Sequence, residues 1–210
     1  MTETDTPFQP LNHRPQWGIY GGTFDPIHTG HLILVREAAH QAGLEKVLVI
    51  PAAQNPFKSD DQSSSAEVRF AMTELALEGD DLLDACDVEI QRTGPSYTID
   101  TVRELQAKFP EVDWYLLVGG DILEHLNDWR EAEELLNMVR LVVLNRVDQR
   151  TEEPSEAGAL SLGLEAVYVD RRLDISSTEI RERVQQGKSI RYWVPERVEQ
   201  FIHDQRLYRG

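Results

Sequence analysis

Short, strongly apolar runs alternate along this chain with longer segments in which apolar residues recur every three or four positions. The short runs are rich in β-branched and aliphatic residues, which is typical of buried strands. They predict strands at about 17–20, 46–50, 86–90, 114–118, 141–144 and 166–169. Because amphipathic segments separate these runs, we expect an α/β fold: a doubly wound, mainly parallel sheet of about six strands with helices on both faces.

The amphipathic segments carry start and stop signals for helices. The first continues from Leu32 at helical spacing until Gly43, a residue suited to ending a helix. The second starts with a capping box at 64–67, and Ser96 and Thr98 are candidate caps for the third. Further helices are expected at about 131–137, after residue 176 and after residue 195.

The 210 residues are enough for one well-buried domain and too few for two comfortable ones. We therefore expect a flexible, polar extension over residues 1–15 and a single domain over residues 16–210. The polar stretch at 146–158 indicates a mobile or inserted linker.

Candidate chemistry begins where the first strand ends, in Gly21-Gly22-Thr23-Phe24-Asp25-Pro26-Ile27-His28-Thr29-Gly30-His31. The glycines let the chain turn sharply and bare its N–H groups, and the two histidines, three positions apart, share a face at the positive end of a helix dipole. This combination predicts a phosphate site, at which Gly30 lets a ligand approach the backbone. The plainer alternative is a helix start that the histidines only cap. Neither a Walker A pattern nor Gly-x-Gly-x-x-Gly is present, and the lack of the latter argues against an NAD-dependent oxidoreductase.

A second candidate anion site lies near the C-terminus. Three hydroxyl residues, Ser176, Ser177 and Thr178, stand at an expected helix start, and Arg181 follows one turn later. A helix cap explains one hydroxyl, whereas all three with the guanidinium suit phosphate oxygens.

Three further residues are weaker candidates. Lys58 follows the second strand, and Asp121 follows the fourth, at the sheet edge where open α/β sheets bind ligands. Lys58 would contact phosphate, and Asp121 would meet a ribose hydroxyl or cap the next helix. Trp129 lies in a polar segment and either offers its face to an aromatic ring or packs in the core.

Charge and composition narrow the partners. The formal net charge of −16 argues against nucleic acid and anionic membranes, both of which need a broad basic face. Without a long apolar run or a basic and apolar leader, the chain is expected to be cytoplasmic. The single cysteine, Cys86, reads as a packed thiol. The sequence leaves open whether the protein forms a homo-oligomer.

With these motifs in place, the sequence resembles the nucleotidyltransferase superfamily and, within it, the bacterial nicotinate-nucleotide adenylyltransferases, from about residue 17 to the C-terminus. The resemblance is carried by the histidine motif at 21–31, by Ser96-Tyr97-Thr98-Ile99-Asp100-Thr101, by Gly120-Asp121 with Trp129, and by Ile175-Ser176-Ser177-Thr178-Glu179-Ile180-Arg181. One departure is Asn55-Pro56-Phe57-Lys58, where the family often has Pro-Pro-His-Lys, so that a histidine contact is lost at Phe57.

The resemblance implies a Rossmann-like nucleotidyltransferase fold and adenylyl transfer from ATP to nicotinate mononucleotide, giving deamido-NAD and pyrophosphate. It makes His28, His31, Lys58 and Arg181 the catalytic residues. The implied ATP site also includes Gly21, Gly22, Thr23, Phe24, Gly30, Asp121, Ile175, Ser176, Ser177 and Thr178. The implied mononucleotide site consists of Gly22, Thr23, Lys58, Thr98, Trp129 and Arg130, with Trp129 stacked on the pyridine and the backbone near Thr98 and Arg130 reading its carboxylate.

Mg²⁺ is expected to travel on the ATP phosphates, without a protein cage for the metal. The alternatives are nicotinamide mononucleotide or phosphopantetheine as the acceptor, or a nucleotide-sensing protein without catalysis.

Overall fold

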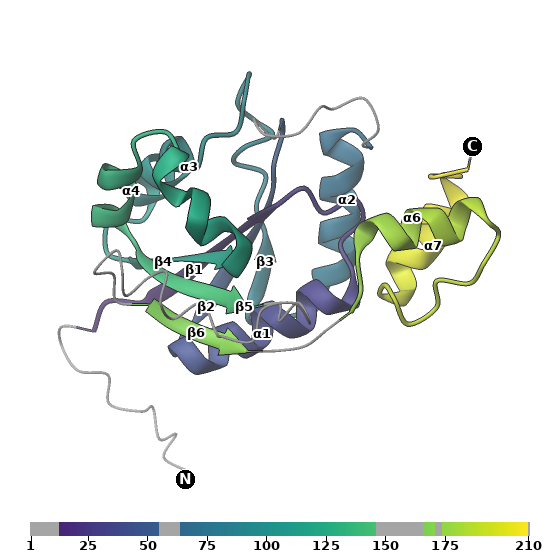
Figure 1. The fold of residues 1–210 in the computed structure, drawn as a ribbon, viewed down its shortest axis with the longest axis horizontal. Helices are drawn as coiled ribbons and strands as arrows, with labels where there is room; N and C mark the ends of the chain where they lie inside the picture. The colour runs from purple at the N-terminus through teal and green to yellow at the C-terminus, as the bar shows by residue number, and fades with distance from the viewer. Residues whose placement is uncertain (1–12, 55–63, 146–165, 171–173, 210) are drawn as a thin grey trace, which may run out of the picture.

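A parallel, six-stranded sheet forms the centre of the computed structural model, which describes residues 13–54, 64–145, 166–170 and 174–209 (Figure 1). The strands are β1 (Gln16–Gly22), β2 (Lys46–Pro51), β3 (Leu83–Ala85), β4 (Asp113–Gly119), β5 (Arg140–Asn145) and β6 (Ala166–Asp170). Their order across the sheet is β3-β2-β1-β4-β5-β6, and every neighbouring pair is parallel. This arrangement confirms the predicted doubly wound fold.

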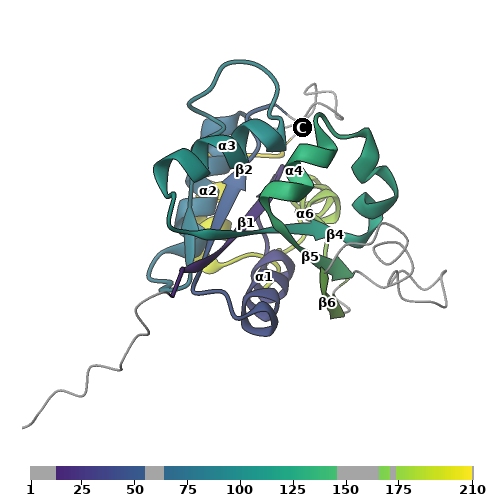
Figure 2. The ribbon, with the colours of Figure 1, turned by 90° about the vertical axis from the view of Figure 1, so that its left-hand side faces the viewer.

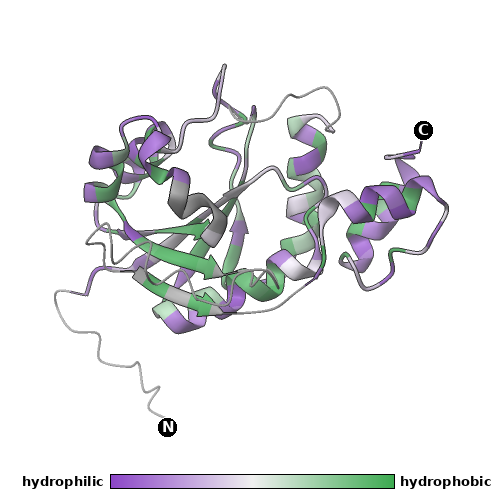
Figure 3. Cartoon of the chain, in the orientation of Figure 1, coloured by the Kyte–Doolittle hydropathy of each residue, from purple (hydrophilic) through white to green (hydrophobic). Residues whose placement is uncertain are grey.

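Helices cover both faces of the sheet. They are α1 (Thr29–Ala42), α2 (Ala66–Leu77), α3 (Thr98–Lys108), the 3₁₀ helix η2 (Gly120–Asp128), α4 (Ala132–Met138), α6 (Ser177–Gln185) and α7 (Glu196–Asp204). Figure 2 shows α1 on one side of the sheet and α3 and α4 on the other. Side chains of β4 alternate accordingly: Tyr115 and Leu117 join the core with α1 and α2, whereas Leu116 and Val118 join the core with α3 and α4. The strands are correspondingly the most apolar part of the chain (Figure 3).

The topology places a ligand crevice between β1 and β4. From β1 the chain crosses to β2 on one side, and from β4 it crosses to β5 on the other, so the order reverses between these two strands. Open α/β sheets bind ligands outside the carboxyl ends of strands at such a switch point. The prediction that the chain turns sharply at Gly21 and Gly22 is wrong, because both glycines still belong to β1 and pair with Ile50 and Pro51 of β2. The loop at that edge begins at Thr23, and Figure 1 shows α6 and α7 beyond it.

The third predicted strand, at 86–90, is wrong in position. The strand lies at Leu83–Ala85, and residues 88–90 form a turn. The carboxylate of Asp80 accepts hydrogen bonds from two main-chain N–H groups at the start of the strand, at 2.9 and 3.0 Å. Val88 is only 2% exposed although it belongs to the turn. Its burial outside a strand explains why the apolar run at 86–90 resembles a strand.

Two predicted helix caps are also corrected. The N-cap of α2 is Ser65, one residue after the predicted Ser64. The N-cap of α3 is Tyr97, whose side chain makes no capping bond, while the Ser96 hydroxyl accepts a hydrogen bond from the N–H of Ala53 at 3.0 Å. Ser96 therefore ties α3 to the loop after β2 instead of capping the helix.

The start of the described chain is attached to the sheet. The N–H of Asp113 donates to the carbonyl of Pro15 at 2.9 Å, and Arg14 pairs with the Asp113 carboxylate at 2.6 Å. The last residues of the expected extension thus contact β4, whereas residues 1–12 and the 146–158 linker lie outside the described residues.

Candidate active site

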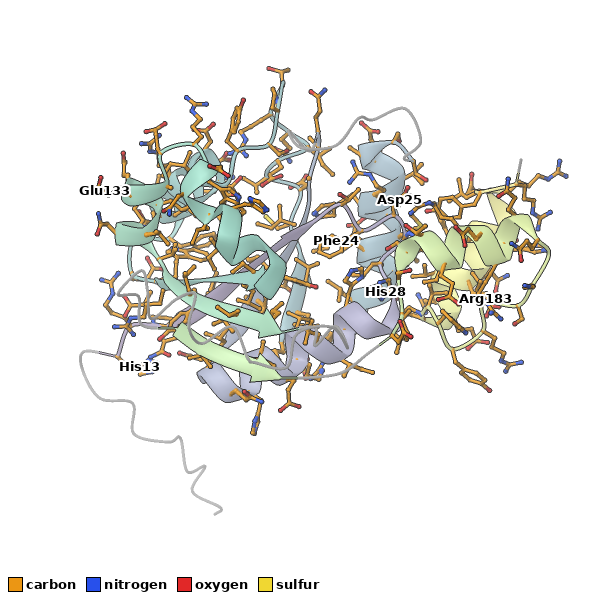
Figure 4. All side chains as sticks on the ribbon, viewed as in Figure 1. His13, Phe24, Asp25, His28, Glu133 and Arg183 are labelled. Carbon is orange, nitrogen blue, oxygen red and sulfur yellow. The ribbon has the colours of Figure 1, made fainter. Side chains whose placement is uncertain are left out.

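The two histidines meet at the start of α1. His28 is the N-cap and His31 is the third residue of the helix, and their rings stack with centroids 3.5 Å apart and planes 18° from parallel. His28 is buried and His31 is half-buried. The prediction that they share one face is confirmed, with the helix beginning one residue later than His28. Figure 4 shows His28 close to Phe24 and Asp25, near α2 and the start of α6.

The histidines cap the helix reciprocally. The N–H of His31 donates to Nδ1 of His28, and the N–H of His28 donates to Nδ1 of His31, both at 3.2 Å. Because both Nδ1 atoms accept, this hydrogen-bond pattern assigns the ring proton of each imidazole to Nε2. The capping alternative is therefore correct as a description of local structure.

The expectation of bare N–H groups at this helix start is wrong for three residues. Those of His28 and His31 bond to the imidazoles, and that of Thr29 donates to the carbonyl of Trp193 at 2.8 Å. These three main-chain groups are thus bonded within the protein and are not bare donors for an anion.

Phe24 shapes the loop between β1 and α1. Its ring is buried and lies edge to face with His31, with centroids 5.1 Å apart. Its φ of 48° is in the left-handed region, which is strained for a residue with a Cβ. A Cβ on Gly22 would lie 2.7 Å from the tip of the Phe24 ring, so glycine is needed there for close packing. Gly21 has no atom within 4 Å of the corresponding position.

Gly30 lies where α1 and the segment before α6 come together. A Cβ on Gly30 would be 3.1 Å from the His28 ring and 3.4 Å from Cβ of Ile175. Glycine at this position thus lets α1 pack closely against the segment before α6. The sequence alone does not reveal this role of Gly30. The two predicted anion sites are neighbours in space.

Each polar side chain of the second predicted anion site already has a protein partner. Ser176 is the N-cap of α6 and accepts from the N–H of Glu179 at 3.2 Å. The Ser177 hydroxyl donates to the carbonyl of Pro26 at 2.9 Å. Arg181 donates to the carbonyl of Asp25 at 2.8 Å and to the Thr178 hydroxyl at 3.3 Å. These bonds attach α6 to the loop after β1, and phosphate contacts by the same residues stay a prediction.

Sequence reasoning missed two buried residues that hold this loop. Arg69 of α2 donates to the carbonyls of Thr23, Ala53 and Ser64 at 2.8, 3.2 and 3.0 Å, joining the loop after β1 to the segments around β2 and α2. The Asp25 carboxylate accepts from the N–H of Ser64 at 3.2 Å. Both side chains are 3% exposed, and only their partners, distant in sequence, reveal their role.

Asp25 has a second partner at the end of the chain. The Tyr208 hydroxyl donates to its carboxylate at 2.6 Å, across 183 positions in the sequence. Burial, followed by the nearby negative charge of Asp25, raises the pKa of the Tyr208 phenol above its ordinary value. The phenol therefore stays protonated and keeps its role as a donor throughout the neutral range.

The side chains of two predicted ligand-binding residues lie outside the part of the chain that the structure describes. Lys58, with Phe57, lies outside the described residues. Asp121 is in the first turn of η2, after β4, but its side chain is not described. The N-cap of η2 is Gly119, so the alternative that Asp121 caps this helix is wrong.

The residues expected to read the acceptor gather between η2 and α3. Trp129 is the C-cap of η2, is half-buried and packs against the core on the α3 side, so part of its ring remains accessible. The Arg130 guanidinium lies 4.9 Å from the centre of the Tyr97 ring. Tyr97 directly precedes Thr98, the first residue of α3. The guanidinium is ion-paired there with the carboxylates of Asp100 and Glu131, at 3.5 and 3.3 Å, so the protein already balances its charge. A contact between this segment and the carboxylate of an acceptor stays a prediction.

Within the described ranges, no group of three or more His, Cys, Asp or Glu side chains is arranged to hold a metal ion. A search of the same residues finds no helix that is both long and apolar enough to cross a membrane.

Comparison with known proteins follows the same line. A family model described as cytidylyltransferase-like matches residues 19–183, which makes this chain a member of that class. A probable nicotinate-nucleotide adenylyltransferase of Synechococcus sp. (strain JA-3-3Ab) is 40% identical over 193 residues, covering 91% of this chain and 93% of the relative. Its counterpart in Opitutus terrae is 41% identical over 193 residues, covering 91% and 97%. The chain belongs to the nicotinate-nucleotide adenylyltransferase family.

Solved structures agree on the fold. The Plasmodium falciparum nicotinic acid mononucleotide adenylyltransferase complexed with NaAD superposes with a TM-score of 0.75, at 18% identity, over 92% of this chain and 97% of that one.

Proposed function

We propose that this protein transfers the adenylyl group of ATP to nicotinate mononucleotide, releasing pyrophosphate and forming deamido-NAD. The observation that carries the proposal is the pair of stacked imidazoles at the start of α1, at the β1/β4 switch point, in a chain about 40% identical to proteins named for this activity. Relatives in complex with NaAD and with APC share the fold and are consistent with it.

The proposed reaction needs positioning more than acid–base chemistry. The phosphate of the mononucleotide is already a nucleophile near neutral pH and attacks the α-phosphorus of ATP in line, while pyrophosphate leaves with the electron pair of the broken P–O bond. No covalent intermediate with the enzyme is required. His28, His31, Arg181 and Lys58 supply N–H donors and positive charge where negative charge develops.

The remaining proposed contacts of ATP come from the end of β1 and the loop after it, and from the starts of α1, η2 and α6. They are Gly21, Gly22, Thr23, Phe24, Gly30, Asp121, Ile175, Ser176, Ser177 and Thr178. A phosphate in this position faces imidazole and guanidinium groups, and nearby Arg69 adds a buried cation that holds the loop.

The imidazole and guanidinium groups proposed here suit an anion and are poor ligands for Mg²⁺, which prefers oxygen. Mg²⁺ would therefore be held mainly by the phosphates of ATP. When bound, it supplies charge neutralisation for the leaving pyrophosphate.

The acceptor would bind between η2 and α3, with Gly22, Thr23 and Lys58 near its phosphate. The half-buried Trp129 offers a ring for the pyridine, and the backbone near Thr98 and Arg130 would bind its carboxylate. Because nicotinamide mononucleotide has a neutral amide instead, the positive end of α3 at Thr98 favours nicotinate.

The test is pyrophosphate release from ATP and nicotinate mononucleotide, with the product identified by mass. Wild-type protein should turn over, and Trp129→Ala should raise the Michaelis constant for the mononucleotide while changing that for ATP little, since one aromatic contact is lost from one substrate. An unchanged mononucleotide constant would remove Trp129 from the site. Nucleotide binding without pyrophosphate release would favour a sensing protein.

A further inference from the structure

The C-terminal part of the chain forms hydrogen bonds with two adjacent residues of the loop after β1, Asp25 and Pro26. From α6, Arg181 bonds to the carbonyl of Asp25 and Ser177 to that of Pro26, at 2.8 and 2.9 Å. From beyond α7, the Tyr208 hydroxyl bonds to the Asp25 carboxylate at 2.6 Å. Figure 1 shows that α6 and α7 lie away from the sheet. They join the rest of the molecule at this loop and through the packing of α7 on α2.

We infer that Tyr208 is a positioning residue, which acts through Asp25 to hold the loop and, with it, the His31 imidazole in place for the reaction. The inference rests on the proposed function for its catalytic consequence. Tyr208 itself bonds to Asp25 and not to a histidine.

The path from Tyr208 to His31 is short and consists of described contacts. Asp25 directly follows Phe24, whose left-handed backbone persists only if neighbouring contacts hold it. The Phe24 ring lies over Gly22 on one side and packs edge to face with the His31 ring on another, with the ring centroids 5.1 Å apart. A change in the position of Asp25 is therefore passed to the His31 ring through a buried aromatic side chain.

The bond is strong enough to matter. A hydroxyl that donates to a buried carboxylate makes a charge-assisted hydrogen bond, which is stronger than a neutral one. Tyr208 is half-buried against the core, and its hydroxyl also lies 3.9 Å from Sδ of Met72 in α2, a second contact that fixes the direction of the hydroxyl. Removing the hydroxyl leaves the ring packed but releases one side of Asp25.

A purely structural role, in which Tyr208 only fastens the end of the chain, makes a different prediction. Loss of the bond would then lower stability and leave turnover by the folded protein unchanged. Tyr115→Phe is a matched control, because Tyr115 is a tyrosine, more buried than Tyr208, whose hydroxyl bonds to Gln16 and Arg140, at 3.1 and 2.9 Å, at the amino end of the sheet.

The first measurement compares turnover in Tyr208→Phe and Tyr115→Phe. We expect Tyr208→Phe to lower kcat by about tenfold, in line with the loss of one bond to a charged group, with both Michaelis constants within about twofold of wild type. Tyr115→Phe should keep kcat. In an Asp25→Ala background, adding Tyr208→Phe should lower kcat by less than about twofold, because the partner is already absent.

The second measurement does not depend on activity. The ring-current field of Phe24 acts on the imidazole of His31, so the His31 Hε1 resonance should move in Tyr208→Phe and stay unchanged in Tyr115→Phe. If wild-type protein shows no adenylyl transfer, the proposed function fails, and this resonance alone decides the positioning role. An unmoved resonance, or equal kcat values for the two tyrosine variants, would overturn it.

Discussion

Replacing Gly22 by alanine places a methyl carbon 2.7, 2.8 and 3.1 Å from three atoms of the Phe24 ring. Carbon atoms in ordinary contact are about 3.5 Å apart, so the ring edge must move by about 0.8 Å. It has little room, because the ring is 4% exposed and is enclosed by Tyr20 and His31, with centroids 5.3 and 5.1 Å away. Overpacking of this kind costs about 1–3 kcal/mol of folding free energy.

The same displacement reaches the reaction through His31. Misplacement of a reacting group by about 1 Å can cost about a hundredfold in rate, so a shift of this size should lower kcat by roughly tenfold or more. Urea unfolding followed by circular dichroism measures the loss of stability, and pyrophosphate release measures the loss of rate.

Gly21→Ala is the control for stability. No atom lies within 4 Å of its Cβ position, so its free energy of unfolding should stay within about 0.5 kcal/mol of wild type. If Gly22→Ala unfolds at the same urea concentration as Gly21→Ala, with an equal slope, the close packing of Phe24 on residue 22 does not matter and the reasoning fails.

Three further predictions concern single side chains. His31→Ala should lower turnover by about a hundredfold and cost about 1 kcal/mol of stability through the lost cap; near-normal initial rates would exclude it from the mechanism. The pKa of Tyr208 is raised in the folded protein, so its phenol ionises first in the unfolded protein, near pH 10. Above that pH, the free energy of unfolding of wild type should fall by up to about 1.4 kcal/mol per pH unit more than that of Tyr208→Phe. Equal slopes in alkaline urea titrations would contradict this. Burial raises the pKa of the Cys86 thiol, so at pH 8 it should react with a disulfide reagent at least about tenfold more slowly in the folded than in the unfolded protein, and equal rates would refute it.

The fold was predictable where one stretch of sequence decides the structure. The strands at β1, β2, β4, β5 and β6 have continuous apolar runs because helices cover both sides of the sheet. The short edge strand β3 has only three residues, and its position is set by the bonds of Asp80 to main-chain N–H groups. An apolar pattern does not report such bonds, and buried Val88 attracted the prediction to the turn instead.

The site divides in the same way. The stacking of His28 on His31 follows from their spacing at one helix start, which is local. The bonds from Arg69 to Thr23 and from Tyr208 to Asp25 span 46 and 183 positions, so no local pattern could indicate them. The reciprocal capping was foreseeable only as the plainer alternative, and the structure shows that capping fixes the ring orientations that a phosphate site would use.

The most direct test of the account compares acceptors side by side. Wild-type protein with ATP and Mg²⁺ is given nicotinate mononucleotide, nicotinamide mononucleotide or phosphopantetheine, and kcat/KM is measured from pyrophosphate release. The account predicts the highest value for nicotinate mononucleotide, a lower one for the amide and none for phosphopantetheine. Equal or better use of either alternative acceptor, or no release with any of the three, would contradict it.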